Sequence, residues 1–251
     1  MDNTHSTNAA RVRDLSYFFP AHNEEANVEA MVSGALEFLP EVVEQFEVIV
    51  VDDGSRDRTK EIAESLASAH PQVRVVSHEV NRGYGGALKS GIGASRYSWI
   101  FFTDGDRQFD VRELRKLLAK VDAQTGAVIG YRMDRKDPWH RSLNARLYKG
   151  LIRILFGLKV RDIDCAFKLM RADQVQPLPL KSNGALISAE MLIRMKQRGT
   201  VIREVGVGHF PRVAGEQSGA NLRVILRMFR ELFALYGELR REAASGRKGS
   251  A

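Results

Sequence analysis

Short apolar runs that end in polar loops recur through the first half of the chain, with amphipathic stretches between them. The run Phe46–Val51, apolar at every position but Glu47, is typical of a strand that helices cover on both faces. Strands that alternate with helices predict an α/β fold with a mainly parallel sheet. Pro20 is expected to end the first strand. The expected strands are Leu15–Phe19, Phe46–Val51, Val73–Ser77, Trp99–Thr103 and Ala127–Gly130.

Helices are expected between these strands, over residues 24–39, 57–69, 85–94 and 111–122. Later elements are a helix at 142–156, a strand at 167–171, a helix at 185–198, a strand at 201–207 and a final long helix. The 251 residues suit one α/β domain with appendages. The predicted parts are a flexible terminus (1–14), a single domain (15–220), an amphipathic helix (221–244) and a polar tail (245–251).

Several classes of protein do not fit this composition. No stretch approaches the ~18–20 apolar residues that a membrane span needs. The polar segment Met1–Asp14 lacks a signal-peptide core, so a cytoplasmic protein is expected. Cys165 is the only cysteine, which excludes an internal disulfide and predicts a small buried hydrophobe.

The net charge of +7 is concentrated in two segments. Nine basic residues stand against two acidic ones between Tyr131 and Arg161, and seven stand against three from Asn221 to Ala251. Such patches favour anionic partners, namely nucleic acid, acidic lipid or phosphorylated ligands. No nucleic-acid-binding motif accompanies the charge, so a nucleic-acid partner is not expected.

Acidic residues follow the predicted strand Trp99–Thr103 in the order Asp104-Gly105-Asp106. Ligands of such sheets bind at the carboxyl ends of the strands, where these residues are expected. Mg²⁺ usually takes one or two protein carboxylates and completes its shell with water and phosphate oxygens. The triplet therefore predicts a divalent metal site, to which Gln108 adds an amide oxygen; a simple turn is the alternative.

Two further loops are expected at the same edge. Asp52-Asp53-Gly54-Ser55 suits a binding loop, or merely a turn with a helix cap. The segment 81–86 (NRGYGG) resembles a glycine-rich phosphate loop, but lacks the Lys-Ser/Thr ending of a P-loop and the spacing of a dinucleotide fingerprint. The sequence therefore supports neither an ATPase nor a dehydrogenase.

Four motifs in this order resemble family 2 inverting glycosyltransferases: residues 20–25 (PAHNEE), 51–55 (VDDGS), 81–85 (NRGYG) and 104–108 (DGDRQ). Residues 130–132 (GYR), Arg141, 162–168 (DIDCAFK) and 212–218 (RVAGEQS) are similar to the polyprenyl-phosphate branch, typified by dolichol-phosphate mannose synthase. The last motif departs from that branch, because Glu216 and Gln217 separate Gly215 from Ser218, where the branch often has one residue. The resemblance implies a glycosyltransferase-A type, Rossmann-like nucleotide-binding sheet.

The resemblance also implies roles for individual residues. The part at 15–130 would bind the nucleotide sugar and the part at 131–220 the acceptor. His22 stands where the family more often has Tyr. Val51 and Asp53 would touch the base. Residues implied to bind the nucleotide sugar are Pro20, Ala21, His22, Asn23, Glu24, Val51, Asp53, Arg82, Asp104, Gly105 and Asp106. Asp104, Asp106 and Gln108 would hold Mg²⁺ or Mn²⁺. Arg132, Arg141 and Arg212, with Ser218 on the acceptor side, would gather phosphates.

The implied reaction moves a hexose, mannose or glucose, from a GDP- or UDP-sugar to a polyprenyl phosphate with inversion. An acceptor phosphate is already anionic and needs no strong base. A hydroxyl acceptor in glycan or glycolipid synthesis would need one, and Asp164 and Glu190 are the candidates. Glu190 has the alternative of a solvated helix charge. A catalytically silent relative that binds nucleotide sugars also stays open.

The final helix is amphipathic. Arginines lie elsewhere around it, which suits a helix in a membrane surface and would make the enzyme peripheral on the inner face of the membrane. Packing on the domain or on a second subunit is the alternative, and the sequence leaves the oligomeric state open. The apolar positions are Leu222, Ile225, Leu226, Phe229, Leu232, Phe233, Tyr236 and Leu239.

Overall fold

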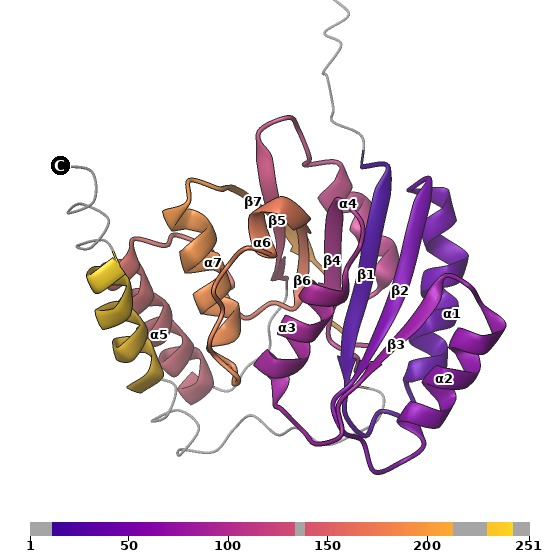
Figure 1. Cartoon of the computed structure of the whole chain (residues 1–251). Coiled ribbons are helices and arrows are strands. Elements are labelled where there is room, and N and C mark those ends of the chain that lie inside the picture. The colour runs from indigo at the N-terminus through magenta and orange to yellow at the C-terminus, as the bar shows by residue number, and fades with distance from the viewer. Residues whose placement is uncertain (1–11, 134–138, 213–229, 243–251) are drawn as a thin grey trace, which may run out of the picture.

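A seven-stranded sheet forms the centre of the computed structural model, which describes residues 12–133, 139–212 and 230–242, with the backbone alone for 139–146 (Figure 1). The strand order is β3-β2-β1-β4-β6-β5-β7, and β6 alone runs antiparallel to its neighbours. This confirms the predicted α/β fold. The strands are β1 (Asp14–Ala21), β2 (Gln45–Asp52), β3 (Val73–Ser77), β4 (Trp99–Thr103), β5 (Thr125–Arg132), β6 (Phe167–Arg171) and β7 (Val201–Val207).

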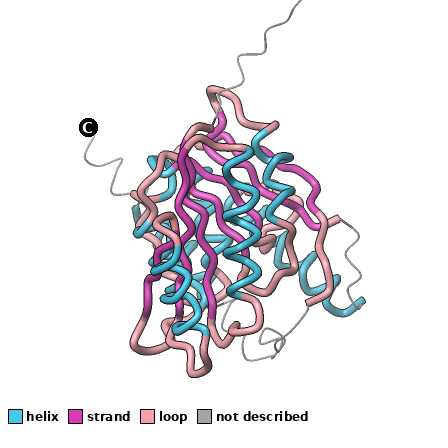
Figure 2. Tube along the Cα trace, turned by 90° about the vertical axis from the view of Figure 1, so that its right-hand side faces the viewer, coloured by secondary structure: helices cyan, strands magenta, loops and turns pink. Residues whose placement is uncertain are grey.

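Both faces of the sheet are covered by helices, because successive side chains of a strand point to opposite faces. Tyr17 and Phe19 pack with α1 (Val28–Phe38), α2 (Thr59–Ala69) and α4 (Leu114–Leu118). Phe18 packs on the other face with α3 (Tyr84–Ala94) and α7 (Ile187–Gln197), near the short α6 (Ala172–Val175). Figure 2 shows the strands as a twisted layer with helices packed against it.

A third apolar cluster joins α5 (Trp139–Phe156), α7 and the helical residues 230–242. Leu232, Leu235 and Leu239 are buried in it, and the ring of Tyr236 lies 5.6 Å from that of Phe156. In Figure 1 this last helix lies beside α5. The described part of the predicted amphipathic helix therefore packs on the domain with its leucines.

The structure corrects two local predictions. Pro20 does not end β1, which continues to Ala21 and pairs with β2. Pairing of β1 with β4 stops at Phe18, so Pro20 lies beyond the last neighbour that would need its missing N–H. The helix predicted at 111–122 is a 3₁₀ turn, Val111–Glu113, followed by the single turn α4.

Residues 1–11 and 243–251, which include most of the predicted flexible terminus and the whole polar tail, lie outside the described residues. Among those that are described, no helix combines the length and the apolar character that a membrane crossing requires.

Candidate functional site

A cavity of about 790 Å³ opens at the carboxyl ends of β1, β2 and β4, the edge to which β1 points in the lower part of Figure 1. Its volume lies in the range of small-ligand sites. The structure brings together ten of the predicted residues in its lining. They are Pro20, Ala21, His22, Asn23, Glu24, Asp53, Asp104, Gly105, Asp106 and Arg212.

Close backbone contacts hold the loops around this cavity. A Cβ atom on Gly105 would lie 2.5 Å from the carbonyl oxygen of Pro20, so only glycine allows the ends of β1 and β4 to approach this closely. Asn23 adopts a φ of 56°; its N–H donates to Ser55 Oγ at 3.0 Å and its side-chain oxygen accepts the N–H of Arg56 at 2.8 Å. The loops after β1 and β2 are therefore bound to each other.

Asp53 connects the β2 loop to the segment before α3. Its N–H donates to the carbonyl of Ala21 at 2.9 Å, and its Oδ1 accepts the N–H of Arg82 at 2.8 Å. The backbone of Arg82 thus supports the site, while its side chain lines a neighbouring cavity of about 510 Å³. The side chain of Val51, which was predicted to touch the base, is fully buried in the core, and Val51 is not among the residues that line the cavity.

Asp104 and Asp106 lie side by side at the end of β4 with different partners. Oδ1 of Asp104 is buried and has no hydrogen-bond partner among the described residues. Burial and the neighbouring charge of Asp106 raise the pKa of Asp104 to about 6. Asp106 accepts the N–H of Gln108 on Oδ1 at 3.1 Å and Arg212 Nη2 on Oδ2 at 2.8 Å.

This pair fits a divalent hard cation. A buried carboxylate oxygen without a partner lacks the interaction that a cation supplies, and two carboxylates suffice for Mg²⁺ beside a diphosphate. Among the described residues, no three His, Cys, Asp or Glu side chains are grouped to hold a metal. The side chain of Gln108, a predicted ligand, lies outside the cavity lining and donates to the carbonyl of Phe210 at 3.1 Å.

The predicted phosphate-binding residues differ in whether they line the cavity. Of those with described side chains, Arg212 lines the cavity. Arg132 instead forms a two-pronged pair with Asp162, from Nε at 2.7 Å and Nη2 at 2.9 Å. The side chain of Arg141 and all of Ser218 lie outside the described part of the chain.

The two predicted bases differ in their surroundings. Asp164 lies in an exposed turn, and its charge helps to raise the pKa of Tyr84, after burial and Asp104. Glu190 is 1% exposed, away from the cavity lining. Its carboxylate accepts the backbone N–H groups of Lys181 and Ser182, the latter at 2.8 Å. This position suits a structural role better than that of a base.

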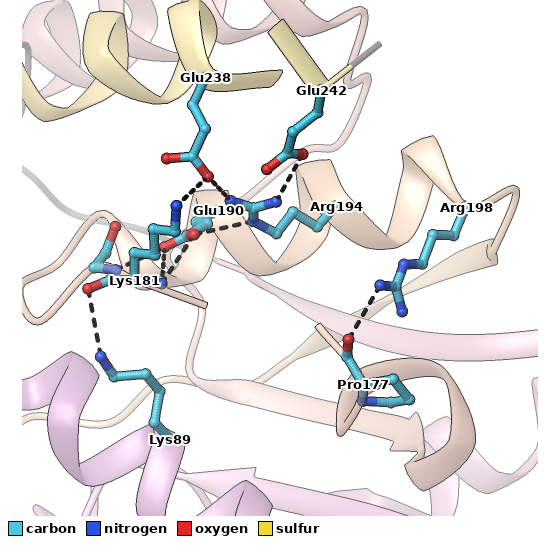
Figure 3. Close-up of polar contacts among 9 residues, drawn as sticks. Lys89, Pro177, Lys181, Glu190, Arg194, Arg198, Glu238 and Glu242 are labelled. Carbon is cyan, nitrogen blue, oxygen red and sulfur yellow. Dashed lines mark hydrogen bonds and ion pairs between the residues drawn. The ribbon is translucent and has the colours of Figure 1, made fainter. Parts of the chain in front are cut away.

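Glu190 belongs to an ion network between α7 and the last helix, which Figure 3 shows and in which Glu190 and Arg194 are buried. Arg194 donates from Nε to Glu190 at 3.0 Å, from Nη2 to Glu238 at 2.7 Å and from Nη1 to Glu242 at 3.4 Å. Lys181 also pairs with Glu238 at 2.8 Å. The network thus connects the last helix to the segment at 181–184, which packs on the N-terminus of α3 through a bond from Gly85 N–H to the carbonyl of Asn183.

Sequence reasoning assigned no role to several residues at the site. Tyr84 and Ala185 line the cavity. Lys168 is fully buried, donates to the carbonyl of Cys165 and lies 5.4 Å from the centre of the Phe102 ring. A lysine within the otherwise apolar run at 167–170 was the available signal. Cys165 itself is buried, as predicted.

Comparison with known proteins finds a glycosyl transferase family model and relatives that are named as sugar transferases. The family model "Glycosyl transferase family 2" matches residues 16–176. Glycosyltransferase AglD of Haloferax volcanii is 31% identical over 239 residues, which cover 90% of this chain and 37% of that protein. An undecaprenyl-phosphate 4-deoxy-4-formamido-L-arabinose transferase of Edwardsiella ictaluri is 27% identical over 220 residues. The chain covers 66% of that protein, and 87% of the chain is matched.

The polyprenol monophosphomannose synthase of Mycolicibacterium smegmatis is 30% identical over 218 residues, covering 81% of each chain. Among solved structures, glucosyl-3-phosphoglycerate synthase of Mycobacterium tuberculosis with Mn²⁺, UDP-glucose and phosphoglyceric acid has a TM-score of 0.71 at 22% identity. The match covers 90% of this chain and 80% of that one, and shows a shared glycosyltransferase-A fold. With the family model covering most of the sheet and its strand-end loops, the chain belongs to glycosyl transferase family 2.

Proposed function

We propose that this protein transfers a hexose from a nucleotide sugar to a polyprenyl phosphate, with inversion at the anomeric carbon. The observation that carries the proposal is the cavity in which Asp53, the Asp104–Asp106 pair and Arg212 converge. Two relatives named as polyprenyl-phosphate or polyprenol glycosyltransferases support the acceptor class. The residues at 15–130 would bind the donor and those at 131–220 the acceptor.

Asp104 and Asp106 would hold Mg²⁺ or Mn²⁺, with Gln108 positioning Asp106 through its backbone N–H. When bound, the cation would offset the negative charge that grows on the leaving nucleoside diphosphate. A glucosyl-3-phosphoglycerate synthase of the same fold has been solved with Mn²⁺ and with Mg²⁺, which supports this assignment.

Arg212 would stabilise phosphate charge in the reaction, because it lines the cavity beside Asp106. An acceptor phosphate oxygen is anionic at neutral pH, so it can attack the anomeric carbon directly while the diphosphate leaves from the opposite side. One such displacement inverts the configuration. Arg132 would support this region indirectly, since Asp162 engages its guanidinium.

The proposal places the protein at the cytoplasmic surface of a membrane, where the polyprenyl chain of the acceptor lies in lipid. Leu147 and Ile154 of α5 are 60% and 81% exposed, and Phe233 of the last helix is 55% exposed. Basic side chains such as Lys149, Arg153 and Arg230 are present on the same helices. This combination suits peripheral contact with anionic lipid.

A direct assay tests the function. Purified protein, incubated with labelled UDP-glucose or GDP-mannose, MgCl₂ and polyprenyl phosphate, is expected to form an acid-labile glycolipid. Product that forms only with a soluble sugar acceptor would overturn the lipid assignment. It would favour a hydroxyl acceptor with Asp164 as the base, for which the exposed turn of Asp164 near Tyr84 is the supporting observation.

The Asp106→Asn variant tests the metal assignment. We expect turnover to fall at least about 100-fold, because loss of a ligand costs more than the 10–100-fold typical of supporting residues. Asp173→Asn is the matched control, since Asp173 of α6 forms an exposed pair with Arg171 at the end of β6. Full activity in EDTA, or equal activity of the two variants, would contradict the metal role. Donor binding without any transfer would identify a catalytically silent relative.

A further inference from the structure

A chain of polar side chains lies behind the wall of the cavity. Asp53 after β2, His78 after β3 and Ser90 on α3 are connected in series. His78 Nδ1 lies 2.6 Å from Asp53 Oδ1, and His78 Nε2 lies 2.8 Å from Ser90 Oγ. The side chains of His78 and Asp53 are only 3% and 5% exposed. Residues after β3 and on α3 therefore fix the carboxylate of Asp53, which follows β2.

With an ionised Asp53 and a neutral His78, each hydrogen bond of the series has one direction. An ionised Asp53 can only accept, so Nδ1 of His78 carries the proton that it donates. Nε2 of a neutral His78 then accepts from the hydroxyl of Ser90. Because Oδ1 also accepts the N–H of Arg82 at 2.8 Å, two donors engage that oxygen. Oδ2 has no hydrogen-bond partner among the described residues, and Asp53 lines the cavity.

We propose that His78 and Ser90 are positioning residues that fix Asp53 as a hydrogen-bond acceptor for the base of the nucleotide donor. The inference rests on the proposed function as a nucleotide-sugar transferase. Uracil and guanine present an N–H donor at N3 and N1, whereas cytosine and adenine present an acceptor there. If the base presents an acceptor to Asp53, neither group receives a hydrogen bond and both are buried. A site built to accept an N–H of one base therefore discriminates strongly against a base that lacks it. The arrangement therefore selects uridine or guanosine diphosphate sugars.

Nucleotide binding measured by calorimetry tests this selection without requiring transfer. The full chain is titrated with UDP, GDP, CDP and ADP in the presence of Mg²⁺. We expect UDP or GDP to bind at least about tenfold more tightly than CDP and ADP. His78→Leu and Ser90→Ala should weaken the preferred nucleotide by about tenfold and threefold, and leave CDP and ADP unchanged. His78→Asn, which keeps an N–H near the position of Nδ1, should restore most of the preference.

Asp53→Asn tests whether the acceptor character of Oδ2 determines which base is bound. If His78 and Arg82 still engage Oδ1, the amide NH₂ takes the place of Oδ2, so discrimination between UDP and CDP should shift toward CDP. In the double variant with His78→Leu, this shift should be lost. His70→Asn, at a histidine outside the cavity lining, is the matched control, and thermal melting checks that each variant is folded.

The possible failures are distinguishable. If the wild-type protein binds none of the four nucleotides, the proposed function and the inference both fall. If it binds UDP or GDP selectively and the His78 and Ser90 variants keep the same selectivity, the inference alone is wrong. A uniform loss of affinity for all four nucleotides would show a merely structural role and would also overturn it.

Discussion

Asp104 is the residue whose surroundings give the clearest pH dependence. Its pKa, raised to about 6 by burial and by Asp106, means that the carboxyl of the metal-free protein holds a proton below that pH. A cation must displace this proton, because only the ionised form is a ligand. We expect the affinity for Mn²⁺ to fall about tenfold per pH unit below 6 and to level off above 6.

Calorimetric titration with MnCl₂ between pH 5 and pH 8, without nucleotide, measures this effect. Omitting the nucleotide is necessary because its terminal phosphate also titrates near pH 6. Asp173→Asn serves again as the control and should show the wild-type profile. An affinity that stays constant over this pH range would contradict the assignment of Asp104.

Which site residues the sequence could reveal depends on where their partners lie. Asp53, Asp104 and Asp106 lie in loops that follow the parallel strands β2 and β4, so topology alone brings them to one edge. The role of Arg132 depends on the side chain at 162, and no local pattern shows that this pair forms. Glu190 and Arg194 have the i,i+4 spacing of a helical ion pair, but the sequence does not show that both are buried. The resemblance to a family located these positions, but only the structure shows their contacts.

At the scale of elements, Arg194 joins α7 to the last helix and should dominate the stability of that contact. Arg194→Met leaves buried Glu190 without its guanidinium, and breaking a buried ion pair costs about 3–5 kcal/mol. Backbone N–H groups still bond to Glu190, so we expect the free energy of unfolding to fall by about 3 kcal/mol. Denaturant unfolding followed by circular dichroism measures the change.

Arg198→Met provides the matched control on the same chain segment. Arg198 donates to the carbonyl of Pro177 at the surface, as Figure 3 shows, and its loss should cost less than about 1 kcal/mol. Adding Glu190→Gln to Arg194→Met should recover part of the stability, because the buried charge is then removed. Equal destabilisation by the two arginine variants would argue against the network.

Elements were predictable where local pattern and tertiary packing agree. The strands Trp99–Thr103 and Phe167–Arg171 match their predicted bounds because both sheet faces are buried there. The edge strand Val73–Ser77 also matches, although it is largely half-buried. Pro20 was misjudged because strand pairing on one side ends before it, which depends on the length of β4 rather than on β1. The amphipathic pattern of the last helix was visible, but the surface that covers its leucines lies on α5 and α7.

At the scale of the whole molecule, the proposed function requires a chain whose described helices do not span a membrane to reach a lipid acceptor. Packing of Leu232, Leu235 and Leu239 on the domain removes them from any lipid contact. Ile154, at 81% exposure, and Phe233 stay available on the adjoining helices. We therefore expect binding to phosphatidylglycerol vesicles that weakens as salt rises, because basic side chains contribute to it.

Ile154→Asp and Phe233→Asp should each weaken binding to these vesicles by about tenfold in a sedimentation assay, since each replaces apolar contact with a charge that anionic lipid repels. Val80→Asp is the matched control, because Val80 is 69% exposed in the loop between β3 and α3. Transfer to a short-chain, water-soluble polyprenyl phosphate should stay unchanged in all three variants, which separates lipid contact from chemistry. If Ile154→Asp binds vesicles as tightly as Val80→Asp, the α5 surface does not face the membrane, and the acceptor must reach the cavity by another route.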